Sequence, residues 1–230
     1  MGMKDIFNSK SGRFLLVVCI GALITTSVSC ARSPQAKRDK FLAAGKQQMD
    51  KKNYNRAVLE FRNAVKAMPN DAESYYQLGM AFVAAGDARD AYLSLKKAVE
   101  LNPNHPLAGL RLGQLMASAR DPDVVKMGQD QLKKLPGAES NPEILSAMAF
   151  AHLKLGETDD AIEALSNALN RSPGQLGSSI LLALANLSKG DANAAEEVLK
   201  QACASNPGSP DPYIVLGQFY RGRDIGLEPP

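Results

Sequence analysis

This chain has few side chains that could act as nucleophiles or metal ligands, and their spacing matches no common catalytic or metal-binding motif. The three cysteines are Cys19, Cys30 and Cys203, and the two histidines are His105 and His152. No CxxC pair and no HExxH, GxSxG, GxGxxG or phosphate-loop spacing is found. A zinc site needs three or four convergent ligands, which this inventory does not offer. The sequence therefore predicts no enzyme activity, no cofactor and no metal.

The remaining titratable groups have structural interpretations. The carboxylate pairs Asp159–Asp160 and Glu196–Glu197 lie near the starts of predicted helices, where the helix dipole favours negative charge. His152 falls inside a predicted helix, and we expect it to pack between helices rather than to act as a catalyst. His105 is expected in a solvated loop, and Cys203 is expected to be a small packing residue.

The charge balance excludes a nucleic-acid footprint. Lys and Arg number 27 against 24 Asp and Glu, and three of the basic residues lie in the first 13 positions. The rest of the chain is therefore nearly neutral, whereas nucleic-acid binding needs a basic face. The chain has no Trp and 6% aromatic residues, which also argues against a surface that stacks nucleobases. We expect protein partners, and neither nucleic acid nor a small-molecule substrate.

The N-terminal residues have the pattern of a secretory signal. Lys4, Lys10 and Arg13 precede the uncharged run from Phe14 to Ile24, and small polar residues follow. An alternative stays open, because the uncharged span from Phe14 to Ala31 is 18 residues long, near the minimum for crossing a bilayer. An uncleaved helix would anchor the protein in the inner membrane, with the basic end inside and the rest outside.

Cys30 ends the small-residue stretch "SVSC", residues 27–30. This stretch resembles a bacterial lipobox, in which the cysteine receives a lipid and becomes the mature N-terminus. Ser27 departs from the usual Leu, and an ordinary signal peptidase would leave Cys30 unmodified. The resemblance implies a signal peptide at 1–29, a tether at 30–37, and a membrane-anchored protein of the bacterial cell envelope that faces the periplasm. Ala31 after the cysteine favours the outer membrane, and the inner membrane is the less favoured location.

The rest of the chain repeats itself with a period of 34 residues. Five kinds of position recur in register: small, small, large apolar, small and proline. The recurring residues are Gly45, Gly79 and Gly113; Ala57, Ala91, Ala161 and Ala195; Phe61, Leu95, Leu165 and Leu199; Ala64, Ala98, Ala168 and Ala202; and Pro69, Pro103, Pro173 and Pro207. The small residues allow two helices to approach closely, and the large apolar residue fills the space between them.

This pattern resembles the tetratricopeptide repeat (TPR), a helix–turn–helix unit of 34 residues. The resemblance covers residues 38–222 and implies an all-α, right-handed solenoid that follows the N-terminal signal or anchor segment. We assign repeats at 38–71, 72–105, 106–141, 142–175 and 176–209, a half repeat at 210–222 and a tail at 223–230. The third repeat is degenerate, with Val125 where Ala is expected. A looser second helix and a longer connection at 137–141 are predicted there.

The turn inside each repeat has its own signature. Gly86, Gly156 and Gly190 are each followed by an acidic residue, and Lys52–Asn53 stands at the equivalent place in the first repeat. Glycine readily adopts the positive φ that ends a first helix, and the acid suits the start of the second. The half repeat supplies only a first helix. We expect its end to expose Phe219 and Tyr220. An uncapped aromatic end of this kind either binds another segment or indicates that the chain has been shortened.

The family's usual ligand groove is the concave face formed by the first helices. Transferring its positions predicts a mostly apolar groove for an apolar or amphipathic segment of a partner protein. Packing against neighbouring helices, or filling by the protein's own tether, is the alternative. The predicted groove residues are Leu42, Lys46, Met49, Tyr76, Met80, Val83, Leu110, Gln114, Ala117, Phe150, Leu153, Lys154, Ile180, Leu184, Leu187, Ile214, Gln218 and Arg221.

These features together predict a non-enzymatic, lipid-anchored interaction scaffold that supports assembly or export by an envelope machine. The chain is similar in this respect to TPR lipoproteins of pilus assembly and to those that accompany exopolysaccharide and exosortase systems. A carboxylate clamp for acidic peptide tails is not favoured, because Leu42 and Tyr76 occupy key positions. The alternative is an inner-membrane adaptor that is held by an uncleaved helix.

Overall fold

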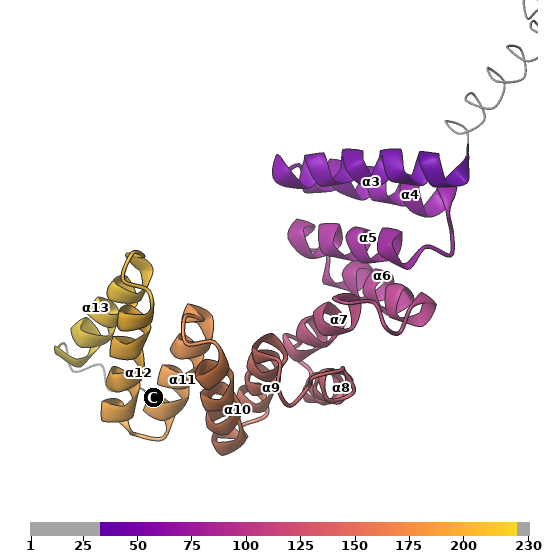
Figure 1. The fold of residues 1–230 in the computed structure, drawn as a ribbon. Helices are drawn as coiled ribbons and strands as arrows, with labels where there is room; N and C mark the ends of the chain where they lie inside the picture. Colours follow the sequence, from indigo (N-terminus) through magenta and orange to yellow (C-terminus); the bar gives the residue numbers. More distant parts are fainter. Residues whose placement is uncertain (1–32, 225–230) are drawn as a thin grey trace, which may run out of the picture. The chain divides into compact units, whose positions relative to one another are not determined.

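The computed structural model describes residues 33–224, and this part of the chain contains eleven helices and no strand. The chain divides into two compact bodies at Asn102 and Pro103. Helices α3–α6 form the N-terminal body and helices α7–α13 form the C-terminal body (Figure 1). No helix between residues 33 and 224 is both long and apolar enough to cross a membrane. The predicted signal peptide, the alternative membrane helix and Cys30 lie outside the described residues.

The N-terminal body consists of two antiparallel helix pairs (Figure 1). The pairs are α3 (Pro34–Asp50) with α4 (Tyr54–Ala67), and α5 (Ala72–Ala85) with α6 (Ala88–Leu101). Phe61 and Leu95, at the predicted large apolar position, are fully buried. Gly79 lets the paired helices approach, because a Cβ built there would lie 2.7 Å from Leu95 Cγ.

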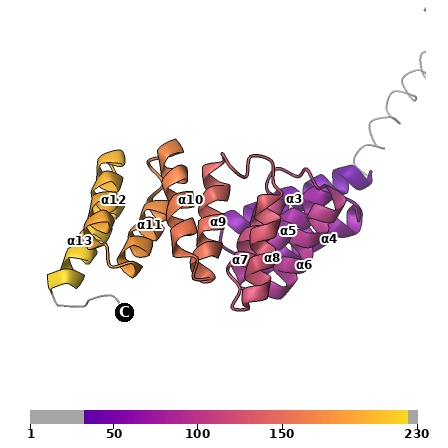
Figure 2. The ribbon, with the colours of Figure 1, turned by 90° about the horizontal axis from the view of Figure 1, so that it is seen from below.

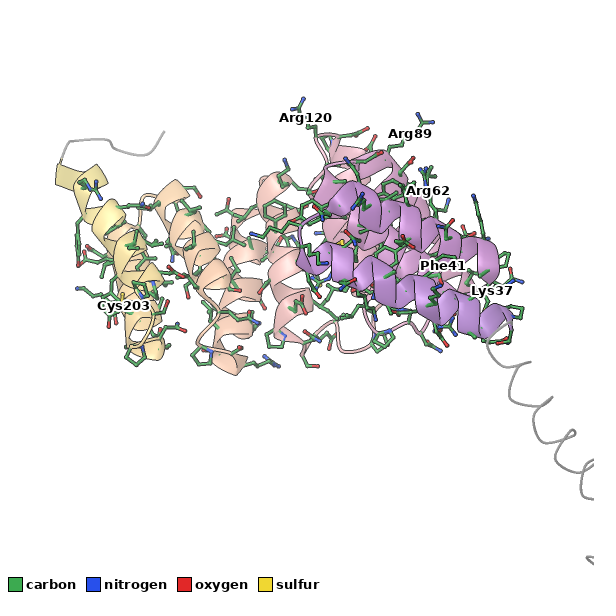
Figure 3. The ribbon with its side chains drawn as sticks, turned by 90° about the horizontal axis from the view of Figure 1, so that it is seen from above. Lys37, Phe41, Arg62, Arg89, Arg120 and Cys203 are labelled. Atoms are coloured by element: carbon green, nitrogen blue, oxygen red, sulfur yellow. The ribbon has the colours of Figure 1, made fainter. Side chains whose placement is uncertain are left out.

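The C-terminal body contains three further pairs and one single helix. They are α7 (Ala108–Ala117) with α8 (Pro122–Lys133), α9 (Pro142–Lys154) with α10 (Thr158–Arg171), α11 (Leu176–Ser188) with α12 (Ala192–Ser205), and α13 (Asp211–Asp224). Helices α9–α13 stack side by side in chain order (Figure 2). Leu165 and Leu199 are buried at the large apolar position, as predicted. Cys203 on α12 is a buried free thiol, which agrees with its predicted packing role (Figure 3).

The degenerate third repeat is not loosely packed, contrary to the prediction. Gln129 stands at the large apolar position and Leu132 stands at the next small position, and both are buried. The large apolar side chain therefore stands three residues later than in the other repeats. Leu132 fills the space beside Gly113, where a Cβ would lie 2.6 Å from Leu132 Cγ. Gly128 brings α8 against α7, because a Cβ there would lie 2.7 Å from the backbone nitrogen of Ala117. The predicted long connection is present and runs from Lys134 to Asn141.

The predicted turns inside the repeats are confirmed. Gly86, Gly156 and Gly190 each have φ of +80°, and Lys52 is the one non-glycine residue of the described chain with positive φ, at 59°. Left-handed backbone is costly for a residue with a Cβ, so glycine suits these turns. The side chain of Asp87 caps α6 by accepting a hydrogen bond from the backbone of Asp90. Glu157 makes no such capping bond, although it precedes α10.

Helices α3 and α13 extend beyond the predicted ends of the repeat region. Residues 34–37, assigned to the tether, form the first turn of α3. Pro34 suits the first helical turn, and Ser33 Oγ caps the helix by accepting from Ala36 N at 3.1 Å. At the other end α13 continues to Asp224, two residues beyond the predicted half repeat. Residues 30–32 of the predicted tether and 225–230 of the tail lie outside the described part.

Candidate functional site

A hollow of about 690 Å³ opens on the C-terminal body along the first helices α7, α9 and α11. We call it the α7–α9–α11 groove. Eleven residues line it: Gln114, Ala117, Glu143, Ser146, Ala147, Phe150, Gln175, Gly177, Ser178, Ile180 and Leu181.

The apolar part of the groove rests on the helix core. Phe150 is half-buried and packs against the buried cluster of Ala117, Val125 and Ala151. Leu181 packs against the next cluster, which contains Leu165. Because these side chains are held by the core beneath them, the groove has a preformed apolar floor that can accept an apolar side chain of a ligand.

A network of hydroxyl and amide groups borders the same groove between α9 and α11. Ser146 Oγ donates to the carbonyl of Pro142 at 2.7 Å and lies 2.7 Å from Ser178 Oγ. Ser178 Oγ lies 3.0 Å from the side-chain amide of Gln175. This run of contacts from Pro142 to Gln175 fixes the start of α11 beside α9.

A second side-chain amide is held at the α7 side of the groove. Arg111 Nη1 donates to Gln114 Oε1 at 2.8 Å and to Glu143 Oε1 at 2.9 Å. A guanidinium only donates, so the Gln114 atom that faces it must be the amide oxygen. The Gln114 amide nitrogen has no partner within the described residues and can donate to a ligand.

Some of the residues predicted to form the ligand groove line this hollow, and others lie elsewhere. Gln114, Ala117, Phe150 and Ile180 all line it. Leu110 does not, because it is buried in a core cluster with Leu132 and Ile144. Two more predicted residues, Leu153 and Leu187, also pack on core clusters. Five others are exposed and do not line the hollow: Lys154, Leu184, Ile214, Gln218 and Arg221.

The predicted groove residues of the N-terminal body lie partly in its core. Leu42 and Tyr76 are buried, so the structure removes them from the predicted partner surface. Lys46 forms an ion pair with Glu73 at 3.8 Å. The remaining three are Met49 and Met80, which are half-buried, and Val83, which is exposed.

The polar lining was missed by the sequence analysis, although part of its signal was present. Ser146 and Glu143 lie four and seven residues before Phe150, so helical spacing places all three on one face of α9. Gln175 and Ser178 come from the start of α11. Gln175 and Ser178 line the groove only because α11 packs closely beside α9. The spacing of residues within one helix does not predict that packing.

One further cluster could hold a divalent cation. His152, Glu157 and Asp160 place ligand atoms within 4.8 Å of one another. His152 Nδ1 lies 2.7 Å from Glu157 Oε2, and buried Gln129 donates to the same carboxylate at 3.3 Å. The hydrogen bond to His152 holds the pKa of Glu157 below its ordinary value of 4.5. These contacts already explain the cluster as a polar tie between α8, α9 and α10.

His105 also has a structural role that the sequence did not reveal. Its Nδ1 accepts a hydrogen bond from the backbone nitrogen of Ala108 at 3.1 Å. This contact caps the start of α7, whose residue Leu107 makes no side-chain cap. His105 is therefore a capping residue rather than a merely solvated one.

Two family models match the chain. The model described as "Cytochrome c-type biogenesis protein H TPR domain" covers residues 29–175, and a general tetratricopeptide repeat model covers residues 147–210. The chain belongs to this TPR family. Membership confirms the repeat interpretation, and the same 34-residue unit explains the helix pairs of both bodies.

The curated relatives of this TPR protein are much longer. Cellulose synthase operon protein C of Pseudomonas fluorescens is 30% identical over 107 residues, which are 46% of this chain and 8% of that protein. The CTR9 homolog of Arabidopsis thaliana is 28% identical over 116 residues, which are 49% of this chain and 10% of that protein. The matched segment thus spans about a tenth of either relative.

Solved TPR structures share the fold. PilW, described as a widely conserved type IV pilus biogenesis factor, has a TM-score of 0.69 at 14% identity and covers 82% of this chain and 86% of its own. MamA of Desulfovibrio magneticus has a TM-score of 0.65 at 20% identity, with 75% and 97% covered. At these identities the likeness establishes the fold and not the partner.

Proposed function

We propose that the protein is a non-enzymatic scaffold that binds an extended segment of a partner polypeptide in the α7–α9–α11 groove. The observation that carries this proposal is the pairing of a preformed apolar floor with the oriented amide donor of Gln114. An extended peptide presents backbone carbonyls that accept hydrogen bonds, and alternate side chains that enter apolar pockets. The NH₂ group of Gln114 suits the former, and the surface around Phe150 suits the latter.

The groove has no feature that would select a strongly charged ligand. Glu143, its one lining carboxylate, is already paired with Arg111 at 2.9 Å. We therefore expect an uncharged or weakly charged apolar segment rather than an acidic tail. This choice follows from the cost of leaving a charge buried without a partner.

The proposal also includes attachment to the cell envelope through a lipid on Cys30, with the repeats facing the periplasm and the outer membrane favoured. Its support is the lipobox-like "SVSC" stretch and the structural likeness to a pilus biogenesis factor. Several acyl chains at about 0.8 kcal/mol per buried methylene anchor a protein firmly. Such a protein would hold a component of an assembly or export machine near the membrane.

Two experiments test these parts separately. A photo-crosslinking residue at Ile180 should trap the partner in living cells, whereas the same residue at Met127, which is exposed on α8 and outside the groove, should not. Equal trapping at both positions would refute the groove. Labelled palmitate should be incorporated into the protein and lost in Cys30→Ala. Membrane attachment without incorporation would favour the inner-membrane adaptor with an uncleaved helix instead.

A further inference from the structure

A polar residue occupies a core position in α8. Gln129 is 5% exposed, at the position that is large and apolar in the regular repeats. The equivalent residues there are Phe61, Leu95, Leu165 and Leu199. Burying a carboxamide costs free energy unless both of its ends find partners. The Gln129 nitrogen has partners, but its carbonyl oxygen makes no hydrogen bond within the described residues. The packing of the repeat therefore does not explain a glutamine at this position.

The Gln129 carboxamide points into the cluster of His152, Glu157 and Asp160. Its nitrogen lies 3.1 Å from His152 Nδ1 and 3.3 Å from Glu157 Oε2. The four residues come from three helices and their ends, because α8 and α10 each pack against α9 (Figure 1). We call these four residues the α8–α9–α10 cluster. The cluster joins the third repeat to the fourth.

Glu157 is directed toward this cluster rather than toward the helix that it precedes. The acidic residues at the equivalent place, Asp87, Asp121 and Asp191, each cap the following helix by accepting a backbone hydrogen bond. Glu157 makes no such bond with α10. Its Oε2 lies 2.7 Å from His152 Nδ1 instead. A carboxylate oxygen and an imidazole nitrogen are therefore held side by side.

The separations of these polar atoms are close to those of a small coordination shell. Four ligands at about 2.1 Å from a tetrahedral Zn²⁺ lie about 3.4 Å from one another. His152 Nδ1 lies 2.7 Å from Glu157 Oε2 and 3.9 Å from Asp160 Oδ2, values on either side of this spacing. A half turn of the Gln129 carboxamide about its last bond exchanges its nitrogen and oxygen, which brings the carbonyl into the cluster. Asp160 is 64% exposed, so its carboxylate can move to complete the shell.

Solvent reaches the cluster through a hollow of about 590 Å³ that His152 and Asp160 help to line. Glu139 and Glu163 line the same hollow, and its one basic lining residue is Lys133. Three carboxylates against one ammonium group attract a cation. The hollow therefore gives a cation a path to the cluster.

We propose that the α8–α9–α10 cluster is a zinc site, which ties the third and fourth repeats together. The ligand atoms are Gln129 Oε1, His152 Nδ1, Glu157 Oε2 and Asp160 Oδ2. Imidazole suits Zn²⁺ and related transition metals, whereas Ca²⁺ and Mg²⁺ take oxygen ligands. Without the ion, the same groups form the polar tie described above. The sequence predicted no metal, because these ligands belong to three helices and include a glutamine, so no motif spacing reveals them.

The probe for this site is ZnCl₂ alone, titrated by calorimetry into the full chain without a histidine tag. Cys19→Ser and Cys30→Ser remove two thiols that could bind zinc elsewhere. We expect one zinc ion per chain. Gln129→Met should bind zinc at least tenfold more weakly, because it keeps an unbranched side chain and removes the carbonyl. Asp160→Ala should also weaken binding at least tenfold, and the exposure of Asp160 makes this change easy for the fold to accept. Circular dichroism without zinc checks that both variants keep their helices.

Asp159→Ala is the matched control, because it removes the neighbouring carboxylate, which pairs with Lys189. It should leave zinc binding unchanged. Hydrogen exchange locates the ion: peptides from α9 and α10 should exchange more slowly with zinc, and those from α5 and α6 should not change.

Absence of saturable zinc binding would overturn the proposal. Equal zinc affinity of the parent chain, Gln129→Met and Asp160→Ala would mean an adventitious ion only, and would overturn it as well. So would equally tight binding of Ca²⁺ that is lost in the same variants, because the site would then select oxygen-preferring cations. These results do not depend on what binds the α7–α9–α11 groove.

Discussion

Gly79 and Gly217 occupy the same position of the repeat, and the structure predicts opposite effects when each becomes alanine. The added methyl group of Gly79→Ala would lie 2.7 Å from Leu95 Cγ and 3.2 Å from the Leu95 backbone nitrogen. The side chain can rotate only within a buried site, and the backbone of α6 must move to relieve the second contact. At Gly217 the same methyl group enters open space.

The expected magnitudes follow from two opposing contributions. Alanine favours a helix interior over glycine by about 0.5–1 kcal/mol, which acts at both positions. Overpacking a tight helix pair costs about 1–3 kcal/mol, which acts at Gly79 alone. Gly217→Ala should therefore stabilise α13 by up to about 1 kcal/mol. Gly79→Ala should destabilise the α5–α6 pair by about 1 kcal/mol net, and by about 2.5 kcal/mol at most, a roughly five- to seventyfold change in the local opening equilibrium.

Native-state hydrogen exchange measured by mass spectrometry suits this comparison, because repeat proteins open locally and each variant acts on its own helices. Peptides from α5 and α6 should exchange faster in Gly79→Ala, and peptides from α13 should exchange more slowly in Gly217→Ala. Each variant is the control for the other. If Gly79→Ala slowed exchange in α5 and α6, close helix approach would not be the reason for glycine at this position.

Two further predictions concern single side chains. The lowered pKa of Glu157 means that its bond to His152 stabilises the fold above the ordinary carboxyl pKa of 4.5 and is lost as pH falls below it. Urea unfolding midpoints of the wild type should thus fall more between about pH 6 and about pH 3 than those of Glu157→Gln, and parallel curves would contradict this role. Cys203 is buried, so in a Cys19→Ser, Cys30→Ser chain its thiol should react with Ellman's reagent only on unfolding. A cysteine introduced at the exposed Tyr213 should react at once, and equal rates would contradict the burial of Cys203.

The sequence predicted those features that depend on residue size at a fixed spacing. The small and large positions located the helix pairs, and Gly86, Gly156 and Gly190 located the turns, because each requirement is met within one repeat. The start of α3 was missed because residues 34–37 were assigned to the tether, although Pro34 suits a first helical turn. Proline occurs both in such turns and in extended tethers, so its presence alone does not decide between them.

The groove was predicted less completely for a different reason. The transferred family positions included Gln114, Phe150 and Ile180, but they could not show that Leu110 and Tyr76 are buried by neighbouring helices. The amide donor of Gln114 was not predicted either, because its availability depends on Arg111 occupying the amide oxygen. Contacts between successive helices, and not the face of one helix, decide which side chains reach a ligand.

In α8 the large apolar side chain, Leu132, stands at a position that is small in the other repeats. This difference affects how the chain avoids pairing its helices incorrectly while it folds. Similar repeats invite a second helix to pack on the first helix of a neighbouring repeat, a known hazard of repeat proteins. If α8 paired with α5 in the standard register, the Gln129 carboxamide would lie over Gly79, where Leu95 now fits, and Leu132 would have to fit where the small side chain of Ala98 is fully buried. The positions of these two side chains therefore favour the pairing of α8 with α7.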